Sequence, residues 1–178
     1  RSAGVGGVAV GAINSAALLM KSANEQHPAG LANSADQVGR NLMKHNHSAL
    51  SAIAPEKNQT AFQKTLGSHD YYFGGPFQDY PLGQIQLTGK ANWQRLSTMA
   101  PTELSQDWLD YLAQHSVDWW VTTEDLPRAE NRVTLNADGQ IQVHFTPNNL
   151  KPHTELISLL EQHLKELGFY MFWHKRMG

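Results

Sequence analysis

The sequence predicts an α+β fold, with helices packed on one face of a mostly antiparallel sheet and a strand–helix unit at the N-terminus. Residues 84–88 alternate between polar and apolar side chains, which predicts a strand with two different faces. Asp138 and Gly139 separate two alternating runs and predict a β-hairpin. Residues 153–167 carry leucines along one side and predict an amphipathic helix. Strands that are grouped together, with helices set apart, are typical of α+β layers.

The N-terminal residues predict half of a βαβ unit. Residues 8–10, Val-Ala-Val, suit a buried parallel strand, and residues 16–22 are strong helix formers with Asn14 or Ser15 as the N-cap. Because a parallel strand needs neighbouring strands, we expect this chain to be a fragment of a larger α/β protein. Without those neighbours the apolar side chains of residues 8–20 should be exposed. We therefore expect self-association or disorder in this segment.

The other elements are predicted from short apolar runs and from turn residues. Strands are expected at residues 50–53, 71–73, 84–88, 117–123, 132–135 and 140–145. Residues 93–115 predict one or two helices, the second of which begins at Pro101 and Thr102. Gly168 follows the last predicted helix in the position of a C′ glycine.

The composition excludes several classes of function. The net charge of −2 gives no basic surface for nucleic acid, and no apolar run has the roughly 20 residues that span a membrane. The chain has no cysteine, which excludes disulfides and thiolate metal sites and favours a reducing compartment such as the cytoplasm. His45 and His47 have no carboxylate close to them in the sequence, so no metal site is predicted.

The strand at residues 84–88 supplies candidate substrate contacts. If helices cover one face of the sheet, Ile85 and Leu87 belong to the core on that face. Three polar residues then share the opposite face, namely Gln84, Gln86 and Thr88. Amide side chains suit a hydroxylated substrate because they donate and accept hydrogen bonds without adding a buried charge. Trp119 or Trp120 would supply an aromatic surface beside them, and parity alone leaves both open. The alternative is that this face is simply solvated.

Several segments, in the same order, resemble the glucose-methanol-choline family of FAD-dependent oxidoreductases. Residues 11–24, GAINSAALLMKSAN, resemble the second signature of the family, which runs Gly-Ala-x-x-Ser-Pro-x-Leu-Leu. Residues 38–45, VGRNLMKH, resemble its V-G-x-N-L-x-x-H segment. Residues 124–135, EDLPRAENRVTL, resemble its E-x-x-P-x-x-x-N-R-V-x-L stretch. Ala16 and Ala23 stand where the signature has Pro and Gly.

The resemblance implies a division into two domains. Residues 1–47 would be a remnant of a Rossmann-type FAD-binding domain, and residues 48–178 a C-terminally incomplete substrate-binding domain. Gly11, Ala12 and Asn14 would approach FAD at a strand-to-helix turn, with Asn41 nearby. The N-terminal G-x-G-x-x-G and the downstream catalytic His of the family do not occur in this sequence. No catalytic residue is therefore predicted here, and the isolated chain should be colourless and inactive.

The resemblance also implies a function for the parent protein. The parent would be an FAD-dependent oxidoreductase that acts on CH–OH groups of alcohols or sugars and transfers a hydride to the flavin. In this chain, Gln84, Gln86 and Trp119 are the predicted substrate contacts. The alternative function is a stand-alone, non-catalytic α+β binding module.

Overall fold

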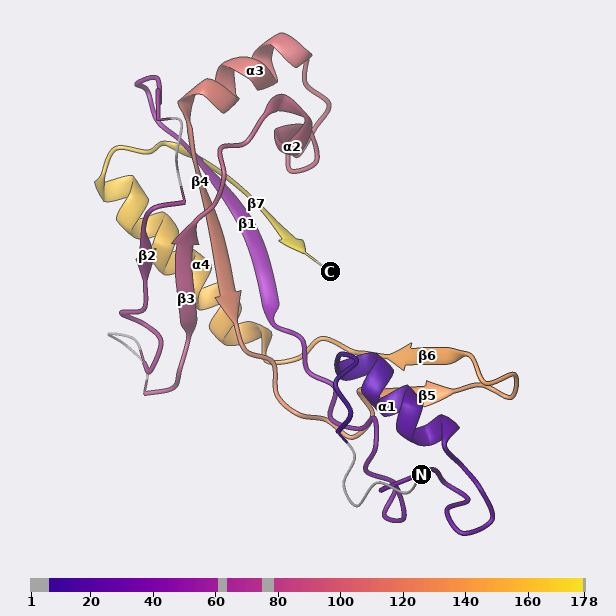
Figure 1. Cartoon of the computed structure of the whole chain (residues 1–178). Helices are drawn as coiled ribbons and strands as arrows, with labels where there is room; N and C mark the ends of the chain where they lie inside the picture. The colour runs from indigo at the N-terminus through magenta and orange to yellow at the C-terminus, as the bar shows by residue number, and fades with distance from the viewer. Residues whose placement is uncertain (1–6, 61–63, 75–78, 178) are drawn as a thin grey trace. The chain divides into compact units, whose positions relative to one another are not determined.

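The computed structural model describes residues 7–60, 64–74 and 79–177, which belong to two compact units (Figure 1). The N-terminal unit comprises Arg1–Lys44 and Leu126–Asn148, and the sheet unit comprises His45–Asp125 and Asn149–Gly178. Helices and a mostly antiparallel sheet together confirm the α+β class. Residues 126–148, which the predicted boundary assigns to the second domain, pack in the unit that contains the N-terminal residues.

The N-terminal unit contains helix α1, Ala12–Lys21, and a hairpin of β5, Arg132–Leu135, with β6, Ile141–His144. The hairpin register runs from Arg132↔His144 to Leu135↔Ile141 and confirms the predicted turn. Gly139 takes a positive φ of 73° there. The Asn136 side chain accepts hydrogen bonds from the backbone N–H groups of Asp138 and Gln140, and these bonds hold the turn closed.

Two predictions at the N-terminus were wrong. Residues 8–10 form no strand, because none of the described residues offers them a backbone partner, and Val8 and Val10 are 47% and 49% exposed. Helix α1 begins after Gly11 (φ 82°) rather than after Asn14 or Ser15. The Gly11 carbonyl already accepts the first helical hydrogen bond, from Ser15 N–H at 2.8 Å, so Asn14 and Ser15 lie inside the helix.

The sheet unit contains five strands in the order β2-β3-β4-β1-β7. Their bounds are β1 Asn46–Ile53, β2 Gly67–Ser68, β3 Gly83–Leu87, β4 Ser116–Thr123 and β7 Met171–Met177. Every neighbouring pair in this sheet is antiparallel. Strand β7 was not predicted. The expected strand at residues 71–73 does not form, because the Tyr72 N–H donates to the His69 carbonyl at 2.9 Å and closes a turn there.

One face of the sheet is covered by α4, Leu150–Glu166, which lies behind the strands in Figure 1. Its apolar side packs against alternate residues of β1, β3 and β4. The core there consists of Leu50, Ala52, Leu82, Ile85, Val121, Leu156, Ile157, Leu160 and Leu164. Ile85 is 5% exposed, which confirms its predicted place in the core. Helix α4 begins earlier than predicted, after the left-handed residue Asn149, and Gly168 (φ 93°) follows its end as expected.

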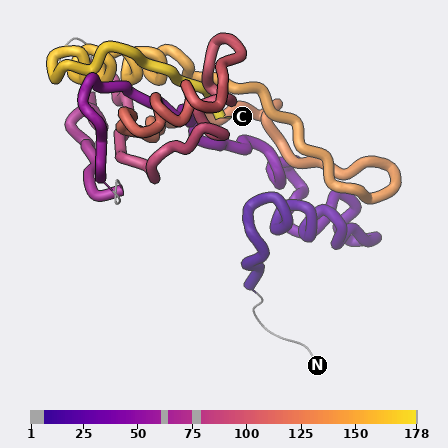
Figure 2. The backbone as a smooth tube through the Cα atoms, turned by 90° about the horizontal axis from the view of Figure 1, so that it is seen from above, coloured from indigo at the N-terminus to yellow at the C-terminus, as the bar shows by residue number. Residues whose placement is uncertain are grey.

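Two shorter helices, α2 Trp93–Ser97 and α3 Gln106–His115, pack at one end of the opposite face (Figure 2). A second core joins them to the sheet and contains Ile53, Ala91, Leu96, Leu109, Leu112 and Ala113. The predicted start of α3 at Pro101 and Thr102 was wrong. Ser105 is the N-cap, since its hydroxyl accepts the backbone N–H of Trp108.

A buried histidine joins α4 to the two central strands. His153 is 4% exposed, and its ring nitrogens lie 2.7 Å from Ser48 Oγ and 3.0 Å from Thr123 Oγ1. Burial, together with the smaller effects of the positive charges of Arg176, His47 and His174, lowers the pKa of His153 from 6.5 to about 4. The folded state therefore holds a neutral imidazole here.

We predict that His153 makes the sheet unit sensitive to acid. Its contribution to stability is complete above pH 6.5 and is lost as the pH falls towards about 4, since only the unfolded chain then binds the proton readily. The loss is at most about 1.4 kcal/mol per pH unit. Urea unfolding across this range should give a shallower pH dependence for His153→Gln than for the native chain. The matched variant at exposed His69, His69→Gln, should keep the native slope, and equal slopes in all three proteins would contradict the prediction.

Candidate functional site

The face of the sheet opposite α4 brings together polar and aromatic residues of three strands. Gln84 pairs with Thr122 and Gln86 pairs with Trp120 across β3 and β4, and His47 of β1 pairs with Thr122 on the other side of β4. Residues that are directly opposite each other in neighbouring strands point to the same face. We call this set, Gln84, Gln86, Trp120, Thr122 and His47, the open face. The prediction that both glutamines lie opposite the helix-backed core is confirmed.

Hydrogen bonds hold the aromatic part of the open face. The Trp120 Nε1–H donates to His47 Nδ1 at 3.2 Å, and the two rings are 5.2 Å apart at a tilt of 36°. Because an indole N–H can only donate, Nδ1 acts as the acceptor, and a neutral His47 carries its proton on Nε2. His47 Nδ1 also lies 3.1 Å from Thr122 Oγ1. The hydrogen bond to His47 thereby holds the edge of the Trp120 ring.

Trp119 lies on the other face of the sheet. It pairs with Leu50 and Leu87 and packs against the α4 core, while its Nε1 is buried without a hydrogen-bond partner among the described residues. The reason is strand alternation, since Trp119 has the parity of the core residue Val121. Among the predicted substrate contacts, Trp119 is thus separated from the two glutamines, and Trp120 takes its place in the candidate site.

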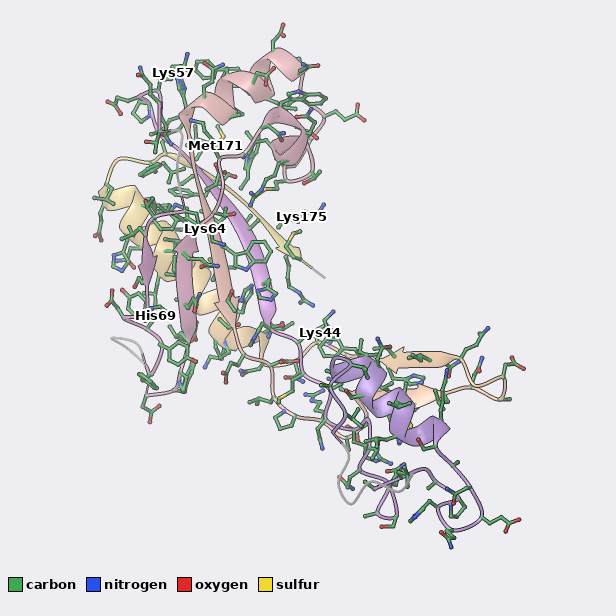
Figure 3. All side chains as sticks on the ribbon, viewed as in Figure 1. Lys44, Lys57, Lys64, His69, Met171 and Lys175 are labelled. Carbon is green, nitrogen blue, oxygen red and sulfur yellow. The ribbon has the colours of Figure 1, made fainter. Side chains whose placement is uncertain are left out.

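A pocket of about 230 Å³ adjoins the open face. Its lining comes from β1, α2, β4 and β7, from the residue after β3 and from the two residues after α2. It consists of Ala49, Thr88, Arg95, Thr98, Met99, Trp120, Lys175 and Met177. Thr88, which was predicted to share a face with Gln84 and Gln86, therefore lines this pocket. Arg95 comes from α2 and Lys175 from β7, where Figure 3 labels it. The pocket thus combines an aromatic wall with two cationic side chains.

The sequence missed several residues of this region, although part of the signal was present. The parity of Val121 would have separated the two tryptophans, since a central valine is a better core candidate than either of them. An ordinary hydrogen-bonding role was expected for His47, but its partner Trp120 could not be identified because it comes from a distant strand. Lys175 was missed because the aromatic run after Gly168 was not recognised as a strand.

The predicted FAD contacts lie in the N-terminal unit. Gly11, Ala12 and Asn14 are exposed at the beginning of α1, and Asn41 is exposed in a left-handed conformation (φ 57°). The first turn of α1 has no acidic residue, and Gly11 provides no side-chain cap. Backbone N–H groups at such a helix start favour anionic groups.

Two segments that are far apart in the sequence lie side by side in the N-terminal unit. Val133 N–H donates to the Gly39 carbonyl and Leu42 N–H donates to the Asn131 carbonyl, each at 2.8 Å. These segments are the ones that resemble V-G-x-N-L and N-R-V in the family pattern. Their contact fixes the backbone on both sides of Asn41.

An ion-pair network strengthens this contact. Asp36 binds both Arg40 and Arg132, the latter with 3.0 Å between Nη2 and Oδ1. The hydrogen bonds from Arg40 and then from Arg132 lower the pKa of Asp36 below its ordinary value. Asp36 therefore stays ionised while it joins the two segments.

Residues 7–60, 64–74 and 79–177 contain no group of at least three His, Cys, Asp or Glu side chains placed to hold a metal ion. Within the same ranges, none of the helices combines the length and the apolar character needed to cross a membrane.

No protein-family profile matches the chain. It is 29% identical over 139 residues to the fructose dehydrogenase large subunit of Gluconobacter japonicus. The similar region covers 74% of this chain and 25% of that subunit, so the chain spans about a quarter of the length of the curated relative that it matches. This similarity distantly relates the chain to an oxidoreductase subunit.

We predict that Gly39 is essential to the contact beside Asn41. Gly39 has a φ of 85°, and a Cβ there would lie 2.4 Å from the Val133 carbonyl oxygen. Gly39→Ala should cost about 2 kcal/mol or more, since it adds backbone strain and a clash with main chain. Hydrogen exchange should speed up in residues 131–135 and stay unchanged in the sheet unit.

Gly139→Ala is the matched control for Gly39→Ala. Gly139 also has a positive φ, of 73°, but a Cβ there would meet nothing within 4 Å. The control therefore introduces the conformational strain without the clash. Equal losses of stability in the two variants would show that the approach of Gly39 to Val133 is unimportant.

Proposed function

We propose that this chain provides the substrate-binding surface of an FAD-dependent oxidoreductase that acts on CH–OH groups of alcohols or sugars. The observation that carries the proposal is the similarity to a fructose dehydrogenase large subunit. The segments that resemble the glucose-methanol-choline family support the same reaction class. The open face gives the proposal a physical basis, because it combines neutral hydrogen-bonding groups with an aromatic surface.

The residues of the open face suit a polyhydroxylated substrate. The amide of Gln86 can donate to one hydroxyl and accept from another, and it adds no formal charge next to a reacting carbon. Gln84 is held by His69, with 3.3 Å between Gln84 Oε1 and His69 Nε2. Trp120 is 5.2 Å from the His47 ring and offers an apolar plane on which the carbon skeleton of a sugar can pack. We assign to these residues the binding and orientation of the substrate.

In the N-terminal unit, we assign Gly11, Ala12, Asn14 and Asn41 to the binding of FAD. The absence of an acidic residue in the first turn of α1 supports this role, since a carboxylate there would repel the FAD phosphates. When bound, the flavin would supply the hydride acceptor. The contribution of this chain is to hold the backbone of residues 39–42 against Asn131 and Val133, so that Asn41 keeps its left-handed conformation.

A non-catalytic binding module is the second candidate function. Such a module could also have an open face with hydrogen-bonding groups. It would not account for the similarity to a dehydrogenase subunit, which extends over 139 residues of this chain. The similarity therefore favours the oxidoreductase.

We predict that Gln86→Ala weakens the oxidation of a hydroxylated substrate in the flavin-containing protein. The lost amide hydrogen bonds should lower kcat/KM by about ten-fold. The flavin absorption spectrum should stay unchanged, because Gln86 is not among the proposed FAD contacts. Steady-state kinetics and absorption spectra test both expectations. Gln162→Ala, on the exposed side of α4, is the matched control and should behave like the native protein. Unchanged kinetics for Gln86→Ala would exclude Gln86 from the site.

A further inference from the structure

The pocket beside α2 has a charge pattern that a neutral substrate does not require. Arg95 and Lys175 both line it, and they come from different elements, α2 and β7. The lining, as far as the chain is described, contains no Asp or Glu. The pocket is therefore electropositive, although the whole chain carries a net charge of −2.

Neither cation is neutralised by a carboxylate in the described structure. Other basic residues do find acidic partners, since Arg40 and Arg132 bind Asp36, and Lys151 lies 3.8 Å from Glu155. Arg95, by contrast, donates through Nη1 to the backbone carbonyl of Gly89 at 3.3 Å, and the described ion pairs do not include it or Lys175. A guanidinium and an ammonium that share a pocket without a carboxylate provide charge for an anionic group.

The carboxylate of Asp118, whose backbone carbonyl accepts the N–H of the lining residue Thr88, is already bonded within the protein. Asp118 is fully buried and accepts hydrogen bonds from Ser51, Ser116 and the backbone N–H of Ala91. These neutral donors satisfy the carboxylate within the sheet. Asp118 also has the same strand parity as Trp120, but it is not part of the pocket lining. Asp118 therefore does not supply the negative charge that the pocket lining lacks, and an external anion can supply it.

The rest of the pocket matches a polyhydroxylated carbon chain. Trp120 forms one wall, and its indole N–H is already bonded to His47, so the ring face is what it offers to a ligand. Met99 and Met177 add apolar surface, and Thr88 and Thr98 add hydroxyl groups. At about 230 Å³ the pocket is smaller than the roughly 300–1,000 Å³ that is typical for drug-sized ligands, and it suits a small molecule.

We propose that this pocket binds an anionic carbohydrate, with its carboxylate or phosphate at Arg95 and Lys175 and its carbon skeleton on Trp120. The planar guanidinium of Arg95 can donate two parallel hydrogen bonds to either anionic group. The inference rests on the proposed function, since it names the substrate class of the same surface. Sugar acids or sugar phosphates, rather than neutral sugars, are then the substrates that this face selects.

Isothermal titration of the chain tests the pocket without requiring flavin or turnover. The probes are gluconate, glucose 6-phosphate and the neutral polyol sorbitol, with acetate and inorganic phosphate as anions that lack the carbohydrate. We expect gluconate or glucose 6-phosphate to bind at least about ten-fold more tightly than sorbitol, and more tightly than the corresponding small anion. Added salt should weaken this binding. The preferred probe identifies the anionic group.

Charge-removing variants locate the binding. Arg95→Gln and Lys175→Gln should each raise the dissociation constant of the preferred probe by about ten-fold, because each removes one charged contact. Arg95 is partly exposed and Lys175 is exposed, so the fold should tolerate both substitutions. Lys57→Gln is the matched control, since exposed Lys57 (Figure 3) lies outside the pocket lining, and it should bind like the native chain.

Three results would overturn the inference, namely equal binding of sorbitol and the anionic sugars, no saturable binding of any probe, and no effect of Arg95→Gln and Lys175→Gln. Tight sorbitol binding that depends on Trp120 would remove the anion but leave the proposed function standing. Anionic binding to the pocket, together with a flavin-containing protein that oxidises no hydroxylated substrate, would leave the pocket standing and remove the proposed function. The two failures are thus distinguishable.

Discussion

The antiparallel pairing of β1 with β4 is the constraint on which the rest of the sheet unit depends. In this register Leu50 lies opposite Trp119 and Ser48 lies opposite Val121, so the apolar side of α4 packs on Leu50 and Val121 and its His153 meets Ser48. Because side chains alternate, the same register sends Ala49 and Trp120 to the other face as neighbours. A shift of one residue would bury Trp120 and expose Val121. Burial against α4 therefore determines the composition of the open face.

Asp118 extends this constraint from the sheet to α2. It accepts the Ser51 hydroxyl of β1 and, at 2.8 Å, the backbone N–H of Ala91, which comes just before the N-cap residue Asn92. A buried carboxylate is costly to leave without donors, so these bonds hold the start of α2 against the sheet. Arg95 lies one turn further along α2. Asp118 thus positions Arg95 in the pocket, although Asp118 itself does not line the pocket.

The predictable part of this structure is the part that local patterns determine. The alternation around Ile85 and the Asp138-Gly139 turn each specify their own geometry, and both predictions were confirmed. Residues 8–10 failed because a parallel strand depends on partners that no local pattern supplies. Trp119 and Trp120 have the same side chain at adjacent positions, and only the packing of Val121 against α4 distinguishes them. The pocket could not be predicted, since four separate elements supply its lining.

In the N-terminal unit, the two segments that resemble the family pattern, residues 38–45 and 124–135, contact each other and depend on the same backbone arrangement. Gly39 must lack a side chain because the Val133 carbonyl lies close to it. Two backbone hydrogen bonds depend on this close approach, from the Val133 N–H to the Gly39 carbonyl and from the Leu42 N–H to the Asn131 carbonyl. A substitution in either segment would disturb the other. Their joint resemblance to one family is therefore evidence for a shared backbone arrangement, and not two independent indications of function. This arrangement holds Asn41 in its left-handed conformation, and the proposed role of Asn41 in binding FAD depends on that conformation.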